Sequence, residues 1–342
     1  MQPAILTCEY LVSPAYCDVQ AVDQAVDDLL AVKKALDQCT VLQIFLEDDA
    51  LEKLEASGEY PTDRLFGHQF AVANFDVFSA KDVARMVHNI IGRATQLSAE
   101  RTGFDVELKD QGYSPGLTGR SAERRGALEE VVRDLGLRNA YDSWDACLLH
   151  ICRVDAMPEI VFKATVTEIY PAMARQPPFE LESAVRIRSS WRRYLEQLPH
   201  LNLFRRFRTN EDLRVSIYGA AVARLVELKR GEEPLGIDDF NVSPEFADSL
   251  RRNQCSEDGA FVSVALEAIA DVLARVPSTT TKIFATKAGG AVARRHNAYS
   301  AYRAHVTKGG LALRLMFWKS DEGRVVFANI GPKSELRIAA PE

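Results

Sequence analysis

The order of elements in the last hundred residues restricts the fold more than any other feature of this chain. Ser243-Pro244-Glu245 predicts an N-cap followed by proline in the first helical turn, a favoured helix start. A short strand is expected before it and a second helix after it, followed by three strand candidates: 237–242, 261–276, 300–308, 311–319 and 324–331. The turns between the last three are short, so these strands are expected to pair antiparallel. The segment therefore predicts an antiparallel meander packed on two helices.

The first 230 residues are expected to be mixed α/β. Helical spacing of apolar residues marks 20–38, and Ser79 is a plausible N-cap for the helix that follows it. Residues 41–47 resemble a buried strand, and 68–78 alternate like a strand. The expected fold class is α+β, with this mixed α/β region preceding a small β-α-α-β-β-β domain.

Loops rich in glycine, proline and polar residues mark the candidate domain boundaries. The main break is expected at 229–236, which separates an acidic domain at 1–230 from a basic domain at 237–342. The first domain could be subdivided near 112–121 or 174–180. We expect it to have a regulatory or targeting role.

Charge is unevenly divided along the chain. Residues 259–340 contain 12 Lys and Arg against 5 Asp and Glu, whereas residues 1–258 contain 30 against 42. A basic segment joined to an acidic one suggests a polyanionic partner or an intramolecular match. Residues 186–208 also interleave arginines with aromatics, a mixture that binds single-stranded nucleic acid. The alternative for that stretch is a helix with buried aromatics and solvated arginines.

Several classes of protein find no support in the sequence. No run of 18 apolar residues predicts a membrane span, and the first residues lack the pattern of a signal peptide. Six cysteines and six histidines are scattered without metal-ligand spacing, so we expect reduced thiols, no metal and no cofactor. A cytoplasmic location and no membrane partner follow as expectations.

The C-terminal segment resembles the RelE/ParE toxin superfamily of bacterial toxin–antitoxin modules, over about residues 237–338. The resemblance lies in the strand and "S-P-E" start at 240–246, Tyr302-Arg303 entering the meander, Arg314 within the central strand, and Gly331 followed by Lys333 after the last strand. It covers about 30% of the chain, and the first 230 residues match no family pattern that we recognise.

That resemblance implies a metal-independent endoribonuclease in which an RNA 2′-hydroxyl attacks the adjacent phosphate. The family's basic positions fall on Arg303, His305, Arg314 and Lys333, which are the candidate catalytic residues. Alternation along the strand puts Arg303 and His305 on one face, and a histidine can titrate near neutrality. Preorganised positive charge would stabilise the transition state. Further basic residues are expected to bind the RNA backbone: Lys287, Arg294, Arg295, His296 and Lys308.

Two functions therefore stand as alternatives. The first is a toxin-like endoribonuclease restrained or targeted by the N-terminal region, acting on RNA or the ribosome in a toxin–antitoxin or antiviral defence setting. The second is a non-catalytic RelE/ParE-like subunit that binds protein or nucleic acid. Many ribonuclease members carry a tyrosine shortly after the last strand, and its absence here favours the second; the retained basic residues favour the first.

Overall fold

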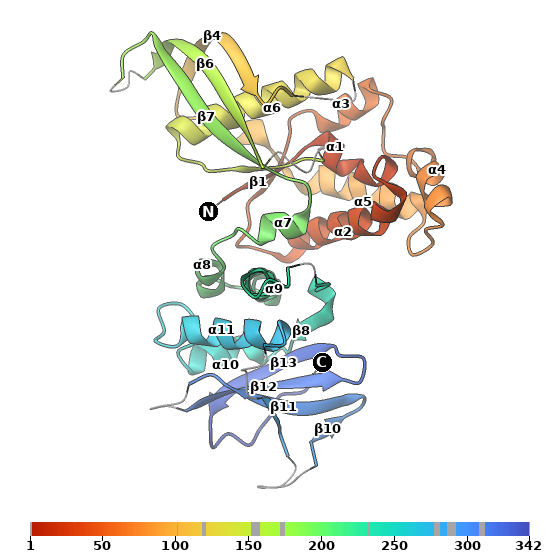
Figure 1. The fold of residues 1–342 in the computed structure, drawn as a ribbon, viewed down its shortest axis with the longest axis vertical. Helices are drawn as coiled ribbons and strands as arrows, with labels where there is room; N and C mark the ends of the chain where they lie inside the picture. Colours follow the sequence, from red (N-terminus) through yellow and green to blue (C-terminus); the bar gives the residue numbers. More distant parts are fainter. Residues whose placement is uncertain are drawn as a thin grey trace. The chain divides into compact units, whose positions relative to one another are not determined.

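The protein is a mixed α+β molecule with two mixed sheets (Figure 1). The computed structural model describes residues 2–100, 102–117, 121–151, 158–171, 175–231, 233–276, 281–285, 292–307 and 312–341. The chain forms two compact units, which we call the N-terminal unit (Met1–Asp37 and Leu42–Tyr194) and the C-terminal unit (Gln38–Val41 and Leu195–Glu342). Among the described helices, none is long and apolar enough to cross a membrane.

The N-terminal unit alternates strands and helices. Its elements are β1 (Ala4–Leu6), α1 (Cys8–Leu11), α2 (Val22–Gln38), β2 (Ile44–Leu46), α3 (Ala50–Ala56), α4 (Asp63–Ala73), α5 (Ala80–Arg93), β3 (Thr95–Gln96), β4 (Asp105–Ser114), α6 (Ala122–Tyr141), β5 (Cys147–Leu149), β6 (Glu159–Tyr170), β7 (Phe179–Arg188) and α7 (Trp191–Leu195).

The sheet of this unit is parallel in its first part and antiparallel in its last. Its described strands lie in the order β3-β2-β1-β5-β7-β6-β4, parallel from β3 to β7 and antiparallel at β7-β6 and β6-β4. The order runs to one side from β1 to β2 and to the other side at β5, which makes the boundary between β1 and β5 a topological switch point. Helix α6 buries Leu128, Val132 and Leu135 in the core cluster that also contains Phe162 of β6 and Val185 of β7.

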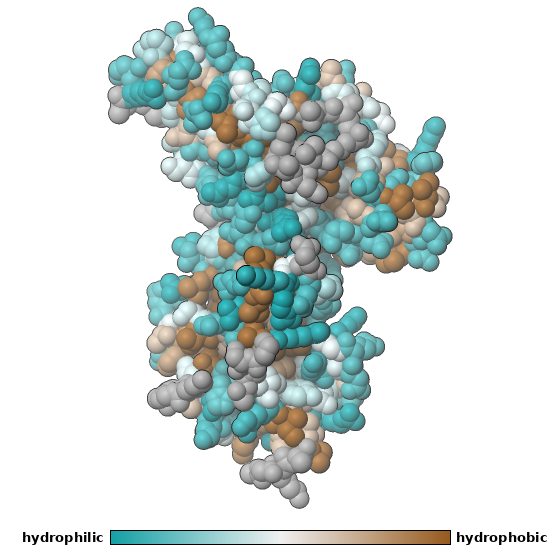
Figure 2. Space-filling model, viewed as in Figure 1, coloured by the Kyte–Doolittle hydropathy of each residue, from teal (hydrophilic) through white to brown (hydrophobic). Residues whose placement is uncertain are grey.

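The strand expected at 68–78 is wrong. Residues 63–73 form the helix α4, whose Thr62 side chain accepts a hydrogen bond from the Leu65 amide as an N-cap. Phe66 and Phe70 are buried four residues apart on one side of the helix, while Val72 is exposed. The surface in view over α4 carries a group of hydrophobic residues (Figure 2). The apolar residues that alternate in this sequence include both buried and exposed ones. On a helix with 3.6 residues per turn, these two groups lie on different sides.

The C-terminal unit contains the element order expected from residue 237 onward. Its elements are α8 (His200–Arg205), α9 (Asn210–Glu227), β8 (Phe240–Val242), α10 (Phe246–Arg252), α11 (Val262–Leu273), β9 (Thr281–Ile283), β10 (Arg295–His296), β11 (Tyr299–His305), β12 (Leu313–Ser320) and β13 (Val325–Pro332). Strands β11, β12 and β13 form an antiparallel meander, and β8 pairs parallel with β13. Strands β9 and β10, which the sequence did not indicate, both pair with β11.

Helices α10 and α11 cover one face of this sheet (Figure 1). Phe246 of α10 stacks on Phe327 of β13, with ring centroids 5.8 Å apart. Helix α10 begins at Phe246, and Ser243 does not cap it. The Ser243 hydroxyl instead donates to the carbonyl of Ala328, 2.7 Å away, the extra residue at a bulge in β13. A bulge leaves a backbone group unpaired in the ladder, and this hydroxyl satisfies it.

The boundary between the units differs from the break expected at 229–236. Helix α9 precedes that loop yet packs within the C-terminal unit on α8 and α11. The segment Gln38–Val41 also belongs to this unit, because the buried Asp212 carboxylate accepts hydrogen bonds from the Thr40 and Val41 amides at 2.6 and 3.1 Å. The same carboxylate accepts from the amides of Arg208 and Thr209 at the start of α9.

Replacement of Asp212 by alanine is expected to destabilise the C-terminal unit by about 3 kcal/mol, because several buried donors lose their acceptor together. Burial alone would raise the pKa of Asp212, but the amides of Arg208, Thr40 and Thr209 outweigh it and lower the pKa. A lowered pKa contributes stability above the unfolded-state pKa that is lost as the pH falls. The difference in the free energy of unfolding between wild type and Asp212→Asn, measured with urea, should therefore become smaller as the pH is lowered.

The exposed Asp248 provides the control, since its ion pair with Arg251 lies at the surface. Asp248→Ala is expected to change the free energy of unfolding by less than about 0.5 kcal/mol. Equal effects of Asp212→Ala and Asp248→Ala would contradict the role given to Asp212.

Candidate functional sites: a basic sheet face and a buried charged cluster

Three of the predicted catalytic residues lie on one face of the C-terminal sheet. Arg303 and His305 are two residues apart on β11, so they point to the same side. His305 lies directly opposite Arg314 of β12, and Arg314 lies opposite Gly331 of β13. We call this side the Arg314 face; the opposite side packs on α10 and α11.

Arg314 is the least exposed cation of this group, at 8%. Its Nη1 donates to the carbonyls of Leu313 at 2.9 Å and Thr307 at 3.3 Å. Burial, with the nearby charge of Arg303, lowers the pKa of Arg314. Within the described part of the chain, no carboxylate forms an ion pair with Arg314. A desolvated cation without a carboxylate is well suited to receive an anionic oxygen.

The Arg314 face also contains a cation that the sequence did not indicate. Lys282 of β9 lies opposite Arg303 and is exposed, while Arg303 and His305 are half-buried. The Arg303 guanidinium lies 5.7 Å from the centre of the Phe284 ring. The signal missed in the sequence was the strand itself, since a three-residue edge strand has too few residues to show alternation.

The remaining predicted residues are less closely grouped. Lys333 is exposed in the turn after β13, and no described contact joins it to Arg314. Arg294 stacks on Phe284 and donates to the carbonyls of Ala285 and Leu336, so its guanidinium is engaged within the fold. Arg295 is exposed, while His296 lies against Trp318 with ring centroids 5.9 Å apart. Lys287 and Lys308 lie outside the described residues.

The segment after β13 lies across part of the Arg314 face. Trp318 Nε1 donates to the Ala339 carbonyl at 2.6 Å, and Asn329 bonds the backbone of Arg337 and Ala339. The Glu335 side chain packs over Gly331, the residue opposite Arg314, with its Cβ 3.0 Å from where a Gly331 Cβ would lie. The Glu335 Oε1 accepts a hydrogen bond from the Arg337 amide at 2.7 Å, so its carboxylate is engaged by the segment after β13.

The interleaved arginines and aromatics at 186–208 do not form an exposed stacking surface. Trp191, Tyr194, Phe204 and Phe207 are all less than 7% exposed. The buried aromatics of the alternative interpretation are confirmed, but the stretch forms the end of strand β7 and two short helices, α7 and α8, rather than one helix. Its exposed arginines are Arg193, Arg205, Arg206 and Arg208.

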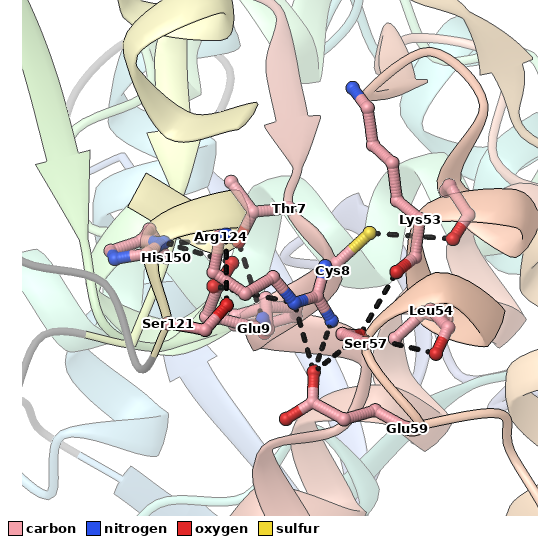
Figure 3. Close-up of polar contacts among 12 residues, drawn as sticks. Thr7, Cys8, Glu9, Lys53, Leu54, Ser57, Glu59, Ser121, Arg124 and His150 are labelled. Atoms are coloured by element: carbon pink, nitrogen blue, oxygen red, sulfur yellow. Dashed lines mark hydrogen bonds and ion pairs between the residues drawn. The ribbon is translucent and has the colours of Figure 1, made fainter. Parts of the chain in front are cut away.

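A second group of polar residues lies buried in the N-terminal unit (Figure 3). Thr7, Cys8 and Glu9 follow β1, Glu47 follows β2, and His150 follows β5. These strands are parallel, so the residues gather at the carboxyl edge of the sheet, at the switch point between β1 and β5. Ligands of open α/β sheets bind at such a position.

Arg124 of α6 organises this cluster and is 2% exposed. Its Nε and Nη2 donate to Glu59 Oε2 at 2.9 and 2.5 Å, and its Nε lies 3.8 Å from Glu9 Oε1. Thr7 Oγ1 lies 3.2 Å from His150 Nδ1, and Glu9 Oε2 lies 3.9 Å from the same nitrogen. Both oxygens therefore lie near the same ring nitrogen of His150. In a catalytic triad the histidine instead uses one ring nitrogen for the nucleophile and the other for the carboxylate.

The low-dielectric environment of the cluster changes its titration. Burial raises the pKa of Glu47 and of the Cys8 thiol, which disfavours the nucleophilic thiolate form of Cys8. Arg124, beside Cys8 and Glu9, has a raised pKa despite its burial. Among the described residues, no group of three His, Cys, Asp or Glu side chains could hold a metal ion. The arrangement fixes α6 to the carboxyl edge of the sheet by charge.

Replacement of Arg124 by methionine is expected to destabilise the N-terminal unit by about 3 to 5 kcal/mol, because Glu9 and Glu59 would remain buried without their cation. The adjacent Arg125→Met is the matched control, since its partner Glu129 is exposed and the pair should contribute less than about 1 kcal/mol. Urea denaturation followed by circular dichroism measures both. A loss below 1 kcal/mol in Arg124→Met would show that the cluster does not hold the fold together.

Comparison with known proteins gives no further assignment. No family model, curated protein or solved structure gave a significant match to this chain.

Proposed function

We propose that the Arg314 face of the C-terminal unit binds RNA and promotes cleavage of a phosphodiester by an adjacent 2′-hydroxyl. The observation that carries this proposal is the register that puts His305 opposite Arg314 and two residues from Arg303. The three side chains come from two neighbouring strands and belong to one face. The sheet fixes the backbone positions of these cations relative to one another, and charge that is preorganised in this way stabilises a transition state more than charge that must first be assembled.

The charge of the surrounding strands supports an anionic ligand. The C-terminal unit from residue 195 onward has 21 Lys and Arg against 18 Asp and Glu, so its positive balance comes from the strand region after residue 259. Lys282 extends the basic group to the edge strand β9. Arginine suits this role because its planar guanidinium can bind two phosphate oxygens together.

Cleavage also needs a proton acceptor and a proton donor. His305 lies directly opposite Arg314 and is of a residue type that can titrate near neutral pH, and we propose that it accepts the proton of the attacking 2′-hydroxyl. The oxygen then bonds to phosphorus, and the bond to the 5′ oxygen breaks as that oxygen takes up a proton. Glu335, packed over Gly331, is the candidate for the second proton transfer. Arg303 and Arg314 would stabilise the additional negative charge on phosphorus.

A second candidate function is RNA or protein binding without cleavage. The half-engaged Arg314 guanidinium, which donates to two backbone carbonyls, favours it, as does the absence of a tyrosine in residues 333–341. In this alternative the same basic face would hold a partner, and the fold would act as a docking subunit.

Removal of the cations is expected to weaken RNA binding in a salt-dependent way. Arg303→Ala and Arg314→Ala should each lower the magnitude of the slope of log affinity against log salt by about 0.7 on single-stranded RNA, if each contacts one phosphate. Lys333→Ala should have a smaller effect, since Lys333 is exposed in the turn after β13 and no described contact joins it to Arg314. Fluorescence anisotropy with labelled RNA measures the slopes, and Arg252→Ala, an exposed arginine on α10, is the control.

The same variants distinguish cleavage from binding. Wild-type protein incubated with RNA, alone and with translating ribosomes, should yield 2′,3′-cyclic phosphate ends, and His305→Ala should abolish them while RNA affinity persists. Binding without any cleavage product would support the docking alternative. Unchanged affinity in both Arg303→Ala and Arg314→Ala would exclude this face as the RNA site.

The toxin-like role with an acidic restraint is a further part of this proposal. The excess of carboxylates in residues 1–258 supplies the charge that could compete with RNA for the basic face. Expression of residues 195–342, with folding checked by circular dichroism because the fragment lacks Gln38–Val41, is then expected to slow bacterial growth more than expression of the full chain. Equal growth of both, with equal protein levels, would argue against such a restraint.

A further inference from the structure

The helix-packed side of the C-terminal sheet borders a pocket that the proposed RNA site does not use. This pocket has a volume of about 770 Å³ and lies among the end of α11, the loop 230–235 and the turn between β12 and β13. Its size falls within the range of small-molecule sites. Tyr302 lines it, and Tyr302 points away from the Arg314 face because it alternates with Arg303 along β11.

The charges that line the pocket do not cancel. Arg230 is neutralised by the two Glu233 oxygens at 2.5 and 2.7 Å, and Asp239 accepts from the Gly236 amide. Three further cations, Arg275, Lys319 and Arg324, are exposed and form no ion pair with any described carboxylate. Asp239 and Glu322 are the lining carboxylates left to oppose them, so three cations face two carboxylates. The pocket therefore favours an anion at its mouth.

The interior of the pocket is aromatic and apolar. Tyr302 stacks on Phe317 with ring centroids 5.8 Å apart and an interplanar angle of 20°. Phe317 is 2% exposed, whereas Tyr302 is half-buried and in reach of a ligand. Apolar side chains of α9 and α11, Leu225 and Leu273, complete the wall. A planar ring would find stacking partners here.

Arg275 occupies the turn that ends α11 and brings its side chain to the mouth of the pocket. Arg275 follows α11 with φ of 49°, a left-handed conformation that glycine adopts without steric cost. Its Nη2 lies 3.9 Å from where a Gly323 Cβ would be, so the guanidinium reaches the turn between β12 and β13. Strain at a side chain that reaches a pocket is a reason to look for function there.

We propose that this pocket binds a nucleotide unit, with the base inside against Tyr302 and the phosphate at Arg275, Lys319 and Arg324. The combination of an aromatic interior and a cationic mouth matches the two chemical halves of such a ligand. The unit could be a free nucleotide or a nucleotide of an RNA strand. The site lies on the opposite side of the sheet from the Arg314 face and does not depend on RNA cleavage there.

Isothermal titration calorimetry of the full-length protein tests this directly with ADP, adenosine, inorganic phosphate and a 5′-phosphorylated RNA trinucleotide. ADP is expected to bind more tightly than either adenosine or phosphate, because each of these satisfies one half of the pocket. Binding of the trinucleotide alone would support the pocket and identify RNA as the source of the unit. Phosphate binding as tight as ADP, or no binding by any of the four, would overturn the proposal.

Variants locate the binding. The double variant Lys319→Glu/Arg324→Glu is expected to lower the affinity for ADP by at least about tenfold, because charge-assisted contacts to the phosphates are lost. Tyr302→Leu keeps an apolar side chain but removes the stacking ring. It should lower the affinity for ADP and leave the weak affinity for phosphate unchanged. Arg252→Glu, an exposed charge reversal on α10, is the matched control and should leave the affinity unchanged. Unaltered ADP affinity in the double variant would refute this location even if the protein binds nucleotides elsewhere.

Discussion

Alternation of side chains along β11 is the constraint from which the chemistry of the C-terminal unit follows. A strand directs successive residues to opposite sides, so Tyr302 and Arg303 cannot serve the same site. Pairing with β12 then places His305 beside Arg314 on one side and Tyr302 on Phe317 on the other. One strand thus supplies a basic surface and an aromatic pocket, and a one-residue slip in register would exchange them.

The N-terminal unit uses charge differently. Its cluster around Arg124 lies at the edge of a parallel sheet where related architectures bind ligands, yet its members are almost completely buried. Removing charges from water is costly, and the cost is offset here by a short contact between the Arg124 guanidinium and Glu59 and by a longer one, 3.8 Å, to Glu9. Such a cluster contributes more to fixing the position of α6 on its sheet than to the net free energy of unfolding.

The sequence predicted the structure correctly where the spacing of apolar residues matches the period of the element that forms. The strands at 300–308, 311–319 and 324–331 and the shared face of Arg303 and His305 followed from period-two alternation and short turns. The pairing of β9 with β11 and the bulge at Ala328 did not, because they depend on long-range hydrogen bonds that leave little trace in composition. Ser243 illustrates the difference: its sequence context predicted a helix cap, and the bulge engages its hydroxyl instead.

The buried cluster was beyond reach for a related reason. Glu9, Glu59, Arg124 and His150 are isolated polar residues separated by tens of positions, and none forms a motif with its neighbours in the chain. The useful signal would have been the place of Glu9 and His150 shortly after short apolar strands, since the carboxyl ends of parallel strands meet at one edge. Glu59 and Arg124, which follow or lie within helices, offered no such signal. The prediction of a strand at 68–78 was wrong for a different reason. Over so short a segment, the apolar residues fit the period of a strand as well as that of a helix.

The segment Gln38–Val41 has a consequence for how this chain is made. It is synthesised about 170 residues before Asp212, the residue whose carboxylate binds its amides, so the C-terminal unit stays incomplete while the intervening unit emerges from the ribosome. The polypeptide crosses between the units on both sides of this segment and again near residue 195. A single protease cut near residue 195 would therefore leave the fragments joined through the short inserted stretch, and the two units would separate only after a second event.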